Sequence, residues 1–236
     1  MTQVNVKLFL DSADLAVIRE YGPRPDIAGA TTNPTLARKA GVSDYLGFCR
    51  EAAAVMGSKS ISFEVFADDA AGMVRQAKTL AGLAPNVYVK IPVTNTEGQP
   101  TTDVVHELSH AGVKLNVTAV FTHTQAWAVM EALKGGAPSI LSMFAGRIAD
   151  AGVDPVPHVA ACVTMAKELD PAIEVLWASP REILNVVHAA QAGCAIITLT
   201  PDLLKKMSNF GKSLKLYSLE TVRMLTGDAV ASGFKL

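Results

Sequence analysis

Short apolar runs alternate with longer amphipathic segments along the whole chain. Runs of this length are typical of β-strands, and strands separated by helices are typical of parallel βαβ units. The expected strands are 6–10, 27–31, 60–65, 86–91, 113–117, 138–142, 173–177 and 195–199. The expected helices are 12–20, 43–56, 68–82, 101–111, 122–134, 156–169, 180–192 and 201–208. This many units within about 200 residues favours a closed (β/α)8 TIM barrel over an open α/β sheet.

One barrel accounts for most of the 236 residues, and no shift in composition marks a domain boundary. We therefore expect a single domain, 1–236. Residues 211–236 follow the last unit and are expected to form an extra C-terminal helix around 218–225 and a tail. This segment would cover the barrel or reach a neighbouring subunit. No Gly-x-Gly-x-x-Gly follows the first strand, which weakens a dinucleotide-binding alternative.

Composition argues against several classes of protein. The chain is 50% hydrophobic and 18% charged, as in a globular protein, and its net charge of −1 includes no basic block that nucleic acid would require. Cys49, Cys162 and Cys194 are far apart, which favours a reduced, cytoplasmic setting. The apolar run 8–10 is too short for a signal peptide, and no stretch approaches the roughly 18 apolar residues of a membrane helix.

Polar side chains occur where the expected strands end, which is the face that carries active sites in barrels of this kind. Lys90 is the most informative of them, because burial on an apolar strand disfavours the charged amine and leaves part of it nucleophilic. Taken alone, Lys90 is better interpreted as a strand lysine that snorkels to solvent. The other positions at strand ends are Asp11, Thr31–Asn33, Glu64, Asn116, Thr118, Ser142–Arg147 and Ser179–Arg181. Each has an ordinary explanation, such as Asp11 and Ser12 capping the first helix. Their joint placement predicts a site.

The C-terminal ends of the strands would bring these side chains together in one depression, called the cup below. A lysine and two carboxylates in the cup permit Schiff-base chemistry. The amine of Lys90 would condense with a ketone, and the iminium would accept electrons while a neighbouring carbon–carbon bond breaks. Asp11 and Glu64 would divide the proton transfers. Arg147 and Arg181 suit a phosphate at the far end of the substrate, because guanidinium groups make charge-assisted contacts with phosphate.

These residues lie in motifs that resemble the transaldolase family, including its small subgroup with the fructose-6-phosphate aldolases. The motifs are Leu10-Asp11-Ser12, Thr31-Thr32-Asn33-Pro34-Thr35-Leu36, Phe63-Glu64-Val65, Val89-Lys90-Ile91-Pro92, Asn116-Val117-Thr118, Ser142-x-Phe144-x-Gly146-Arg147 and Ala178-Ser179-x-Arg181. The resemblance implies transfer of a dihydroxyacetone unit from a ketose phosphate, such as fructose 6-phosphate or sedoheptulose 7-phosphate, to an aldose phosphate in the pentose phosphate pathway. It implies no cofactor and no metal.

The resemblance also implies a role for each matching residue. Lys90 would form the Schiff base, Asp11 would be the acid/base at the cleaved bond, and Glu64 would act through a water held by Thr118. The dihydroxyacetone part would be bound by Thr32, Asn33 and Asn116, and the phosphate end by Ser142, Arg147, Ser179 and Arg181. A homo-oligomer, a decamer or pentamer with the C-terminal helix at subunit contacts, is implied as well.

Two positions distinguish activities within the family. The fructose-6-phosphate aldolases look different at the sites matching Glu64 and Phe144, with glutamine and tyrosine there, so we expect transfer rather than release of free dihydroxyacetone. Two features depart from the family pattern. Trp177 stands where smaller residues look more usual and could narrow the pocket mouth, and the linker 94–100 is longer and more polar than expected. The acceptor sugar is therefore left open.

Three other functions are alternatives to dihydroxyacetone transfer. His106-Glu107-Leu108-Ser109-His110 matches the zincin signature, in which two histidines on one helix face bind zinc and the glutamate is the base. No clear third ligand follows, and the segment lies on an outer helix. A noncatalytic phosphosugar-binding barrel is disfavoured by the lysine at position 90. A deoxysugar-phosphate aldolase is disfavoured, because such enzymes tend to use a second lysine at a strand end near the first, and none is expected near Lys90.

Overall fold

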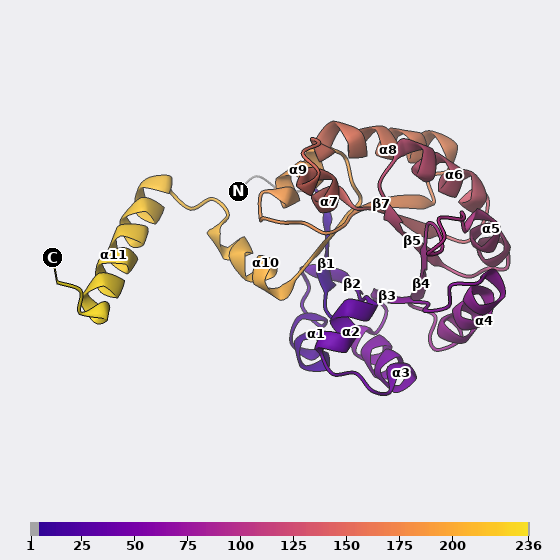
Figure 1. The fold of residues 1–236 in the computed structure, drawn as a ribbon, viewed down its shortest axis with the longest axis horizontal. Coiled ribbons are helices and arrows are strands. Elements are labelled where there is room, and N and C mark those ends of the chain that lie inside the picture. The colour runs from indigo at the N-terminus through magenta and orange to yellow at the C-terminus, as the bar shows by residue number, and fades with distance from the viewer. Residues whose placement is uncertain (1–4, 236) are drawn as a thin grey trace.

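The computed structural model describes residues 5–235, and its strands close into a parallel barrel in chain order. Figure 1 shows most of the helices as a ring outside the strands, with the C-terminal helix apart from it. The strands are β1 (Lys7–Asp11), β2 (Ile27–Thr31), β3 (Ser60–Glu64), β4 (Val87–Pro92), β5 (Leu115–Val120), β6 (Ser139–Met143), β7 (Ile173–Trp177) and β8 (Ile196–Leu199). The fold is therefore the expected (β/α)8 barrel, and each strand lies within three residues of its predicted bounds.

The helices differ more from the prediction than the strands do. They are α1 (Leu15–Tyr21), α2 (Pro34–Lys39), α3 (Tyr45–Met56), α4 (Ala70–Ala81), α5 (Thr102–His110), α6 (His123–Leu133), α7 (Ala145–Asp150), α8 (Pro155–Leu169), α9 (Asn185–Gln191), α10 (Pro201–Lys206) and α11 (Leu214–Ser232). A 3-10 turn, Met207–Asn209, follows α10. The prediction missed α2 and α7, because six residues make fewer than two helical turns and show little periodicity. The equally short α10 was predicted as 201–208, where the 3-10 turn extends it.

Capping residues explain where several helices begin. Asp69 accepts a hydrogen bond from the Gly72 N–H and starts α4, and Thr122 with Gln125 forms a capping box at α6. The first helix was predicted to begin at residue 12, which is wrong. Asp14 caps α1 by accepting from the Ala16 N–H, so Asp11 is not a capping residue.

The core has two parts. The larger lies between the strands and the helices, and a smaller cluster fills the barrel interior with Phe9, Ile140, Leu176, Ala178 and Ile196. Gly29 of β2 makes room for this cluster, because a Cβ there would lie 2.6 Å from the Phe9 ring. Apolar side chains therefore fill the inside of the barrel beneath its C-terminal end.

Two non-glycine residues with left-handed backbone occur at that end. Ala119 has φ 59° where the β5–β6 register shifts, and Ser179 has φ 59° just after β7. Such conformations are costly and concentrate at functional sites. Gly146 fits against the second of them, since a Cβ at position 146 would lie 1.5 Å from the Ser179 carbonyl oxygen.

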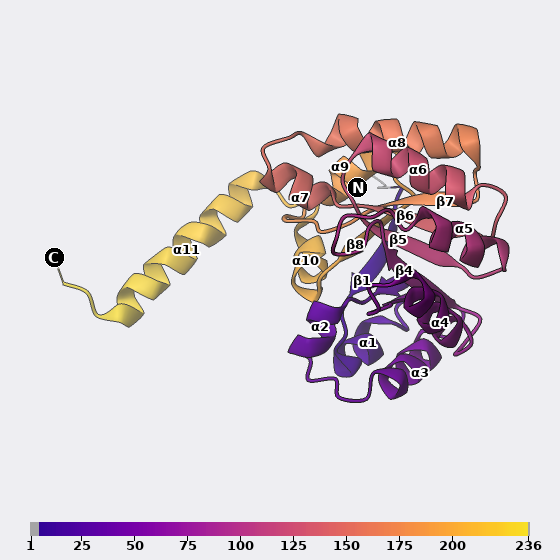
Figure 2. The same cartoon turned by 45° about the vertical axis from the view of Figure 1, so that its right-hand side comes forward.

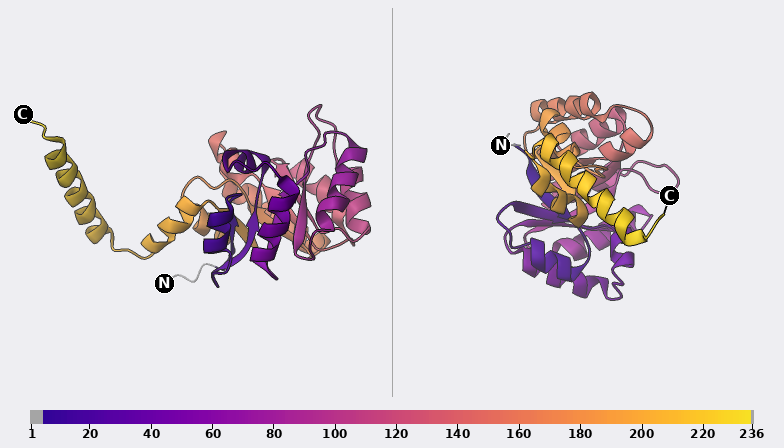
Figure 3. Two further views of the ribbon diagram at one scale, coloured as in Figure 1. Left: turned by 90° about the horizontal axis from the view of Figure 1, so that it is seen from below. Right: turned by 90° about the vertical axis from the view of Figure 1, so that its left-hand side faces the viewer.

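The C-terminal helix α11 stands apart from the barrel. Figures 1, 2 and 3 agree that it projects outward beyond α10. It spans 19 residues, none of them buried, and is much longer than the predicted 218–225. Among residues 5–235, no helix has the length and apolar character needed to cross a membrane.

Candidate active site

Lys90 and Glu64 form an ion pair inside the C-terminal end of the barrel. The two residues are neighbours in the β3–β4 register, and Lys90 Nζ lies 3.0 Å from Glu64 Oε2. Their side chains are 9% and 16% exposed. The same amine donates to the Thr32 carbonyl oxygen at 2.9 Å. A buried ammonium needs such partners, since desolvation alone strongly disfavours its charge.

Asp11 lies in the same cup at the end of β1. Its Oδ1 accepts a hydrogen bond from the Thr31 hydroxyl at 2.7 Å, and Thr31 Oγ1 lies 2.6 Å from Thr198 Oγ1. Burial raises the pKa of the Asp11 carboxyl above its ordinary value of 3.8, although the charge of Lys90 and the Thr31 hydrogen bond oppose that shift. The two carboxylates therefore lie in different settings, since Glu64 is paired with an ammonium and Asp11 with a hydroxyl.

A second polar cluster crosses β3, β5 and β6. Asn116 Nδ2 donates to Ser62 Oγ at 3.0 Å, and the Ser142 hydroxyl donates to Asn116 Oδ1 at 2.7 Å. These side chains are buried. Thr118, two residues beyond Asn116, has a buried hydroxyl without a partner among the described residues. Such a hydroxyl is satisfied most simply by a water or a ligand.

The two arginines lie on the surface of the C-terminal face. Arg147 is exposed on α7, with its guanidinium carbon 5.9 Å from the Phe144 ring centroid. Arg181 is also exposed, and its guanidinium pairs with both carboxylate oxygens of Asp150. An anion binding here would therefore compete with Asp150 for Arg181.

The remaining predicted residues differ in what their side chains do. The Thr32 hydroxyl donates to the Ser62 carbonyl oxygen at 2.9 Å, so it is the main chain of Thr32 that contacts Lys90. Asn33 Oδ1 caps α2 by accepting from the Leu36 N–H. Phe144 packs against Phe121, with ring centroids 5.6 Å apart. Ser179 follows β7 in its left-handed conformation.

Trp177 was expected to narrow the mouth of the pocket, and this expectation is wrong. The side chain is fully buried on the outer side of β7, so it does not narrow the mouth of the cup. Strand alternation explains this, because Leu176 faces the interior and its neighbour must face the helices.

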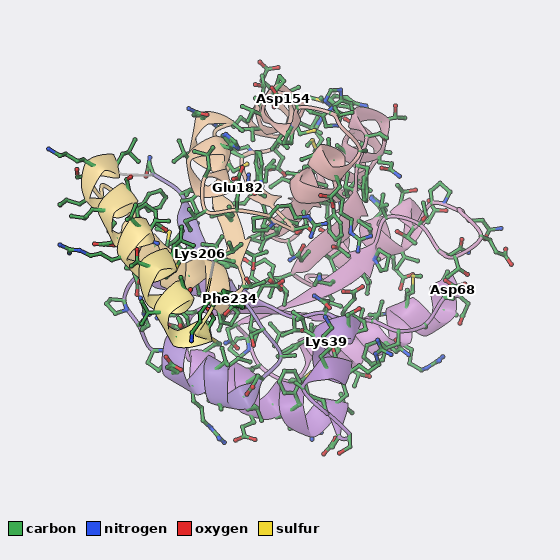
Figure 4. All side chains as sticks on the ribbon, turned by 60° about the vertical axis from the view of Figure 1, so that its left-hand side comes forward. Lys39, Asp68, Asp154, Glu182, Lys206 and Phe234 are labelled. Atoms are coloured by element: carbon green, nitrogen blue, oxygen red, sulfur yellow. The ribbon has the colours of Figure 1, made fainter. Side chains whose placement is uncertain are left out.

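The linker 94–100 is an ordered hairpin after β4. Thr94 pairs with Pro100, and Asp68 accepts hydrogen bonds from the Thr96 N–H and hydroxyl. Figure 4 shows Asp68 at the edge of the barrel. A cavity of about 460 Å³ lies between this hairpin and the start of α4. The linker 94–100 therefore forms an ordered segment beside the strand that carries Lys90.

The zincin-like residues on α5 have other partners. His110 Nδ1 lies 2.9 Å from the His106 carbonyl oxygen, and Glu107 pairs with Lys78 at 3.1 Å. In the part of the chain that the structure describes, no three His, Cys, Asp or Glu side chains are grouped as metal ligands. The site around Lys90 therefore involves none of the zincin-like residues.

Sequence reasoning missed several residues that contact the site. Ser62 and Thr198 join its hydrogen-bond networks, Asp150 pairs with Arg181, and Tyr45 contacts the backbone of Glu64. A signal for Ser62 was present, because it lies two residues before Glu64 and so shares its face of the strand. Tyr45 gave no signal, because it lies on an outer helix.

The fold and the buried lysine–carboxylate pair at the C-terminal face are those of an α/β-barrel enzyme. A model of the Transaldolase/Fructose-6-phosphate aldolase family matches residues 8–233, and the chain belongs to that family. A probable transaldolase of Dehalococcoides mccartyi is 37% identical over 202 residues, which is 86% of this chain and 90% of that protein. A probable transaldolase of Methanococcus maripaludis is 37% identical over 204 residues, with the same coverage. The chain is thus an enzyme of the transaldolase type.

Solved structures support the fold alone. KGPDC from Streptococcus mutans matches with a TM-score of 0.57 and 10% identity, over 84% of this chain and 88% of that chain. A second structure of the same protein, in a complex, matches with a TM-score of 0.54 and 10% identity, over 83% of this chain and 88% of that chain.

The raised pKa of Asp11 predicts that Asp11→Asn stabilises the protein while reducing its activity. Below pH 3.8 the carboxyl is protonated in both folded and unfolded states, so it adds no cost. As the pH rises from there through the folded-state pKa, the wild type must come to hold a buried carboxylate and loses stability, whereas the asparagine variant does not. The Tm of the variant should therefore exceed that of the wild type near neutral pH, and this difference should vanish toward pH 4.

Asp14→Asn is the matched control, because asparagine caps a helix as well as aspartate does and Asp14 lies outside the cup. A lower Tm of Asp11→Asn at neutral pH would show that the carboxylate stabilises the fold instead.

Proposed function

We propose that this protein transfers a dihydroxyacetone unit from a ketose phosphate to an aldose phosphate through a Schiff base on Lys90. The observation that carries the proposal is the buried Lys90 amine, 3.0 Å from Glu64 and in the same cup as Asp11. An amine so enclosed needs a nearby proton acceptor to become a nucleophile, and in this proposal Glu64, 3.0 Å away, is that acceptor.

Schiff-base formation comes first. Glu64 takes one proton from the Lys90 ammonium, and the neutral amine attacks the C2 carbonyl of the ketose. The carbinolamine then loses water, so that ammonium and ketone give iminium and one water molecule. Glu64 passes the protons through a water held by Thr118, whose buried hydroxyl lacks a protein partner among the described residues.

Asp11 acts at the bond that breaks. It takes the proton of the C4 hydroxyl, the C3–C4 bond opens, and the electron pair moves into the iminium to give an enamine and a free aldose phosphate. The enamine then attacks the aldehyde of the acceptor, and Asp11 returns its proton to the new hydroxyl. Hydrolysis of the iminium releases the product. A raised pKa suits Asp11 to this exchange, because it makes the carboxylate a stronger base.

The other polar residues divide the substrate between two regions. Asn116, Thr32 and Asn33 bind the dihydroxyacetone part, and Asn116 is the one of these whose amide already lies in a buried network of the cup. Ser142, Ser179, Arg147 and Arg181 bind the phosphate end. Arg181 is available once the anion displaces Asp150, which is an exposed exchange of low cost.

Phe144 favours transfer over cleavage to free dihydroxyacetone. Release requires protonation of the enamine carbon, and a phenyl ring supplies no proton. Its packing against Phe121 also keeps an apolar surface near the intermediate. The fructose-6-phosphate aldolase reaction is therefore the second candidate, favoured only by the shared family.

The setting that fits this reaction is the cytoplasm, where the pentose phosphate pathway supplies both substrates. Cys49, Cys162 and Cys194 are free and buried, which supports a compartment that keeps thiols reduced.

Borohydride reduction in the presence of fructose 6-phosphate should give a stable adduct on Lys90. The added mass should correspond to a dihydroxyacetone unit or to the hexose phosphate. The ion pair and burial make this the amine best placed to form an iminium. Peptide mass mapping locates the adduct. Lys90→Met is the control and should give none.

An adduct on Lys7 or Lys114, or no adduct at all, would overturn the mechanism. Those amines lie at the opposite strand ends, where Lys7 pairs with Glu174 and Lys114 donates to the Pro85 carbonyl oxygen.

The substitution Phe144→Tyr should raise the ratio of free dihydroxyacetone released to dihydroxyacetone transferred by about tenfold. This increase is smaller than general acid catalysis usually gives, because the new hydroxyl is not optimised for the task. The new hydroxyl would supply a proton to the enamine. Coupled enzyme assays with and without an acceptor aldose phosphate measure the ratio. Phe121→Tyr is the control at the packing partner. An unchanged ratio in a folded Phe144→Tyr enzyme would count against this role of Phe144.

We further propose that the barrel acts as one catalytic domain and that α11 joins it to other copies in a homo-oligomer. The helix exposes apolar side chains on several sides. Such a helix is usually covered by other protein chains on those sides. They are Leu214, Leu216, Tyr217, Leu219, Val222, Met224, Leu225 and Val230. The decamer or pentamer that the family resemblance implies is the form to test.

The double substitution Leu219→Glu, Val222→Glu should convert the oligomer into smaller species, because it places charges on the apolar surface of α11. Sedimentation or mass photometry of the full chain measures this. Lys215→Glu on the same helix is the control for added negative charge. A wild type that is monomeric at micromolar concentration would refute the proposal.

A further inference from the structure

We propose that Tyr45, on the outer helix α3, is a positioning residue that sets the place of both Glu64 and Lys90. The proposal builds on the proposed function, because it concerns the same lysine–carboxylate pair. Tyr45 itself touches no substrate. It acts through the main chain of Glu64, at the point where the β2–β3 ladder ends.

The strand register shows which bonds are missing there. Thr31 pairs with Ser62, and the Thr32 N–H donates to the Ser62 carbonyl oxygen at 3.0 Å. In a regular parallel ladder, the Glu64 N–H would next bond to the Thr32 carbonyl, and the Glu64 carbonyl would accept from residue 34. Residue 34 is proline, which has no N–H to donate. The ladder therefore cannot continue past Ser62 in full, because the Glu64 carbonyl has no donor on the β2 side. The Glu64 N–H does not bond the Thr32 carbonyl either, since it donates to Tyr45.

The hydroxyl of Tyr45 supplies both partners. It accepts from the Glu64 N–H and donates to the Glu64 carbonyl oxygen, each at 3.2 Å. A phenol can do both, since it carries one donor and free lone pairs. One side chain outside the barrel thus replaces two ladder bonds at the end of β3.

This replacement leaves the Thr32 carbonyl free for Lys90. With the Glu64 N–H bonded to Tyr45, the Thr32 carbonyl oxygen accepts from Lys90 Nζ at 2.9 Å. The same amine lies 3.0 Å from the carboxylate of Glu64. Tyr45 therefore holds the backbone of the residue whose carboxylate pairs with the amine, and the Thr32 carbonyl accepts from Lys90 without competition from the Glu64 N–H.

Tyr45 is held firmly enough for this task. Its ring packs on Phe66, with centroids 4.5 Å apart, and on Phe48, at 6.2 Å. Phe48 in turn meets Phe63, the residue before Glu64, at 6.0 Å. Asp44 caps α3 directly before Tyr45. Burial raises the pKa of the Tyr45 phenol, so the hydroxyl keeps the proton that it donates.

The test is Tyr45→Phe, which keeps the ring and removes only the hydroxyl. The Glu64 N–H and carbonyl then both lose their partner, so the end of β3 and the carboxylate that it carries are no longer held in place beside Lys90. We expect kcat to fall about tenfold or more, with KM changed less than about twofold, since general acid–base catalysis contributes at least that much. The single-turnover rate of borohydride trapping on Lys90 should fall in parallel.

Tyr21→Phe is the matched control, because Tyr21 also lies on an outer helix, α1, where it is buried and packs outside the cup. It should leave both rates unchanged. A purely structural role of Tyr45 would lower the Tm of Tyr45→Phe without changing the trapping rate well below that Tm. A folded Tyr45→Phe enzyme with wild-type kcat and trapping rate would overturn the proposal.

Two further outcomes keep the tests separate. Absence of a Lys90 adduct in the wild type would refute the proposed function, whereas equal adduct rates in wild type and Tyr45→Phe would refute only the role of Tyr45. Should Tyr45→Phe not fold, Phe66→Leu loosens the same ring from the exposed side. That variant should show a smaller fall in kcat at unchanged KM, and an unchanged kcat would overturn the proposal.

Discussion

The ion pair of Lys90 and Glu64 is the interaction around which the site is built. An ammonium buried to this extent is tolerated only with close, well-directed partners, because desolvation opposes its charge. The partners come from different strands. Glu64 lies opposite Lys90 on β3, and the carbonyl of Thr32 follows β2. The amine is therefore held by the two preceding strands of the barrel rather than by its own strand.

The residues that stabilise the barrel and the polar residues of the cup occupy different parts of its interior. Phe9, Ile140, Leu176 and Ile196 fill the interior with apolar side chains, and the polar groups gather at its C-terminal end. Asp11 lies at that end, where burial raises its pKa, so its charged form opposes folding. The polar cup is tolerated because a large apolar core, inside and outside the strands, supplies the stability of the domain.

Much of the fold and part of the site were predictable from the sequence. The strands were found because they are short, apolar and separated by amphipathic helices. Lys90, Asp11 and Glu64, which the structure brings together, were singled out as candidates because they end such strands. The errors have physical causes. The six-residue α2 and α7 show no periodicity, Asp14 rather than Asp11 caps α1, and the facing of Trp177 follows from the register of β7. Asp150 was missed, because its contact with Arg181 joins two segments far apart in the chain.

The sequence by itself determined the barrel and the identity of its strand-end residues, since alternation and residue type are local properties that can be read along the chain. Tertiary structure alone decided which groups meet. It placed the Thr32 carbonyl rather than its hydroxyl against Lys90, and it brought Tyr45 from an outer helix to the backbone of Glu64. Such contacts depend on strand register and helix docking, which join residues far apart in the chain and leave no pattern in the sequence.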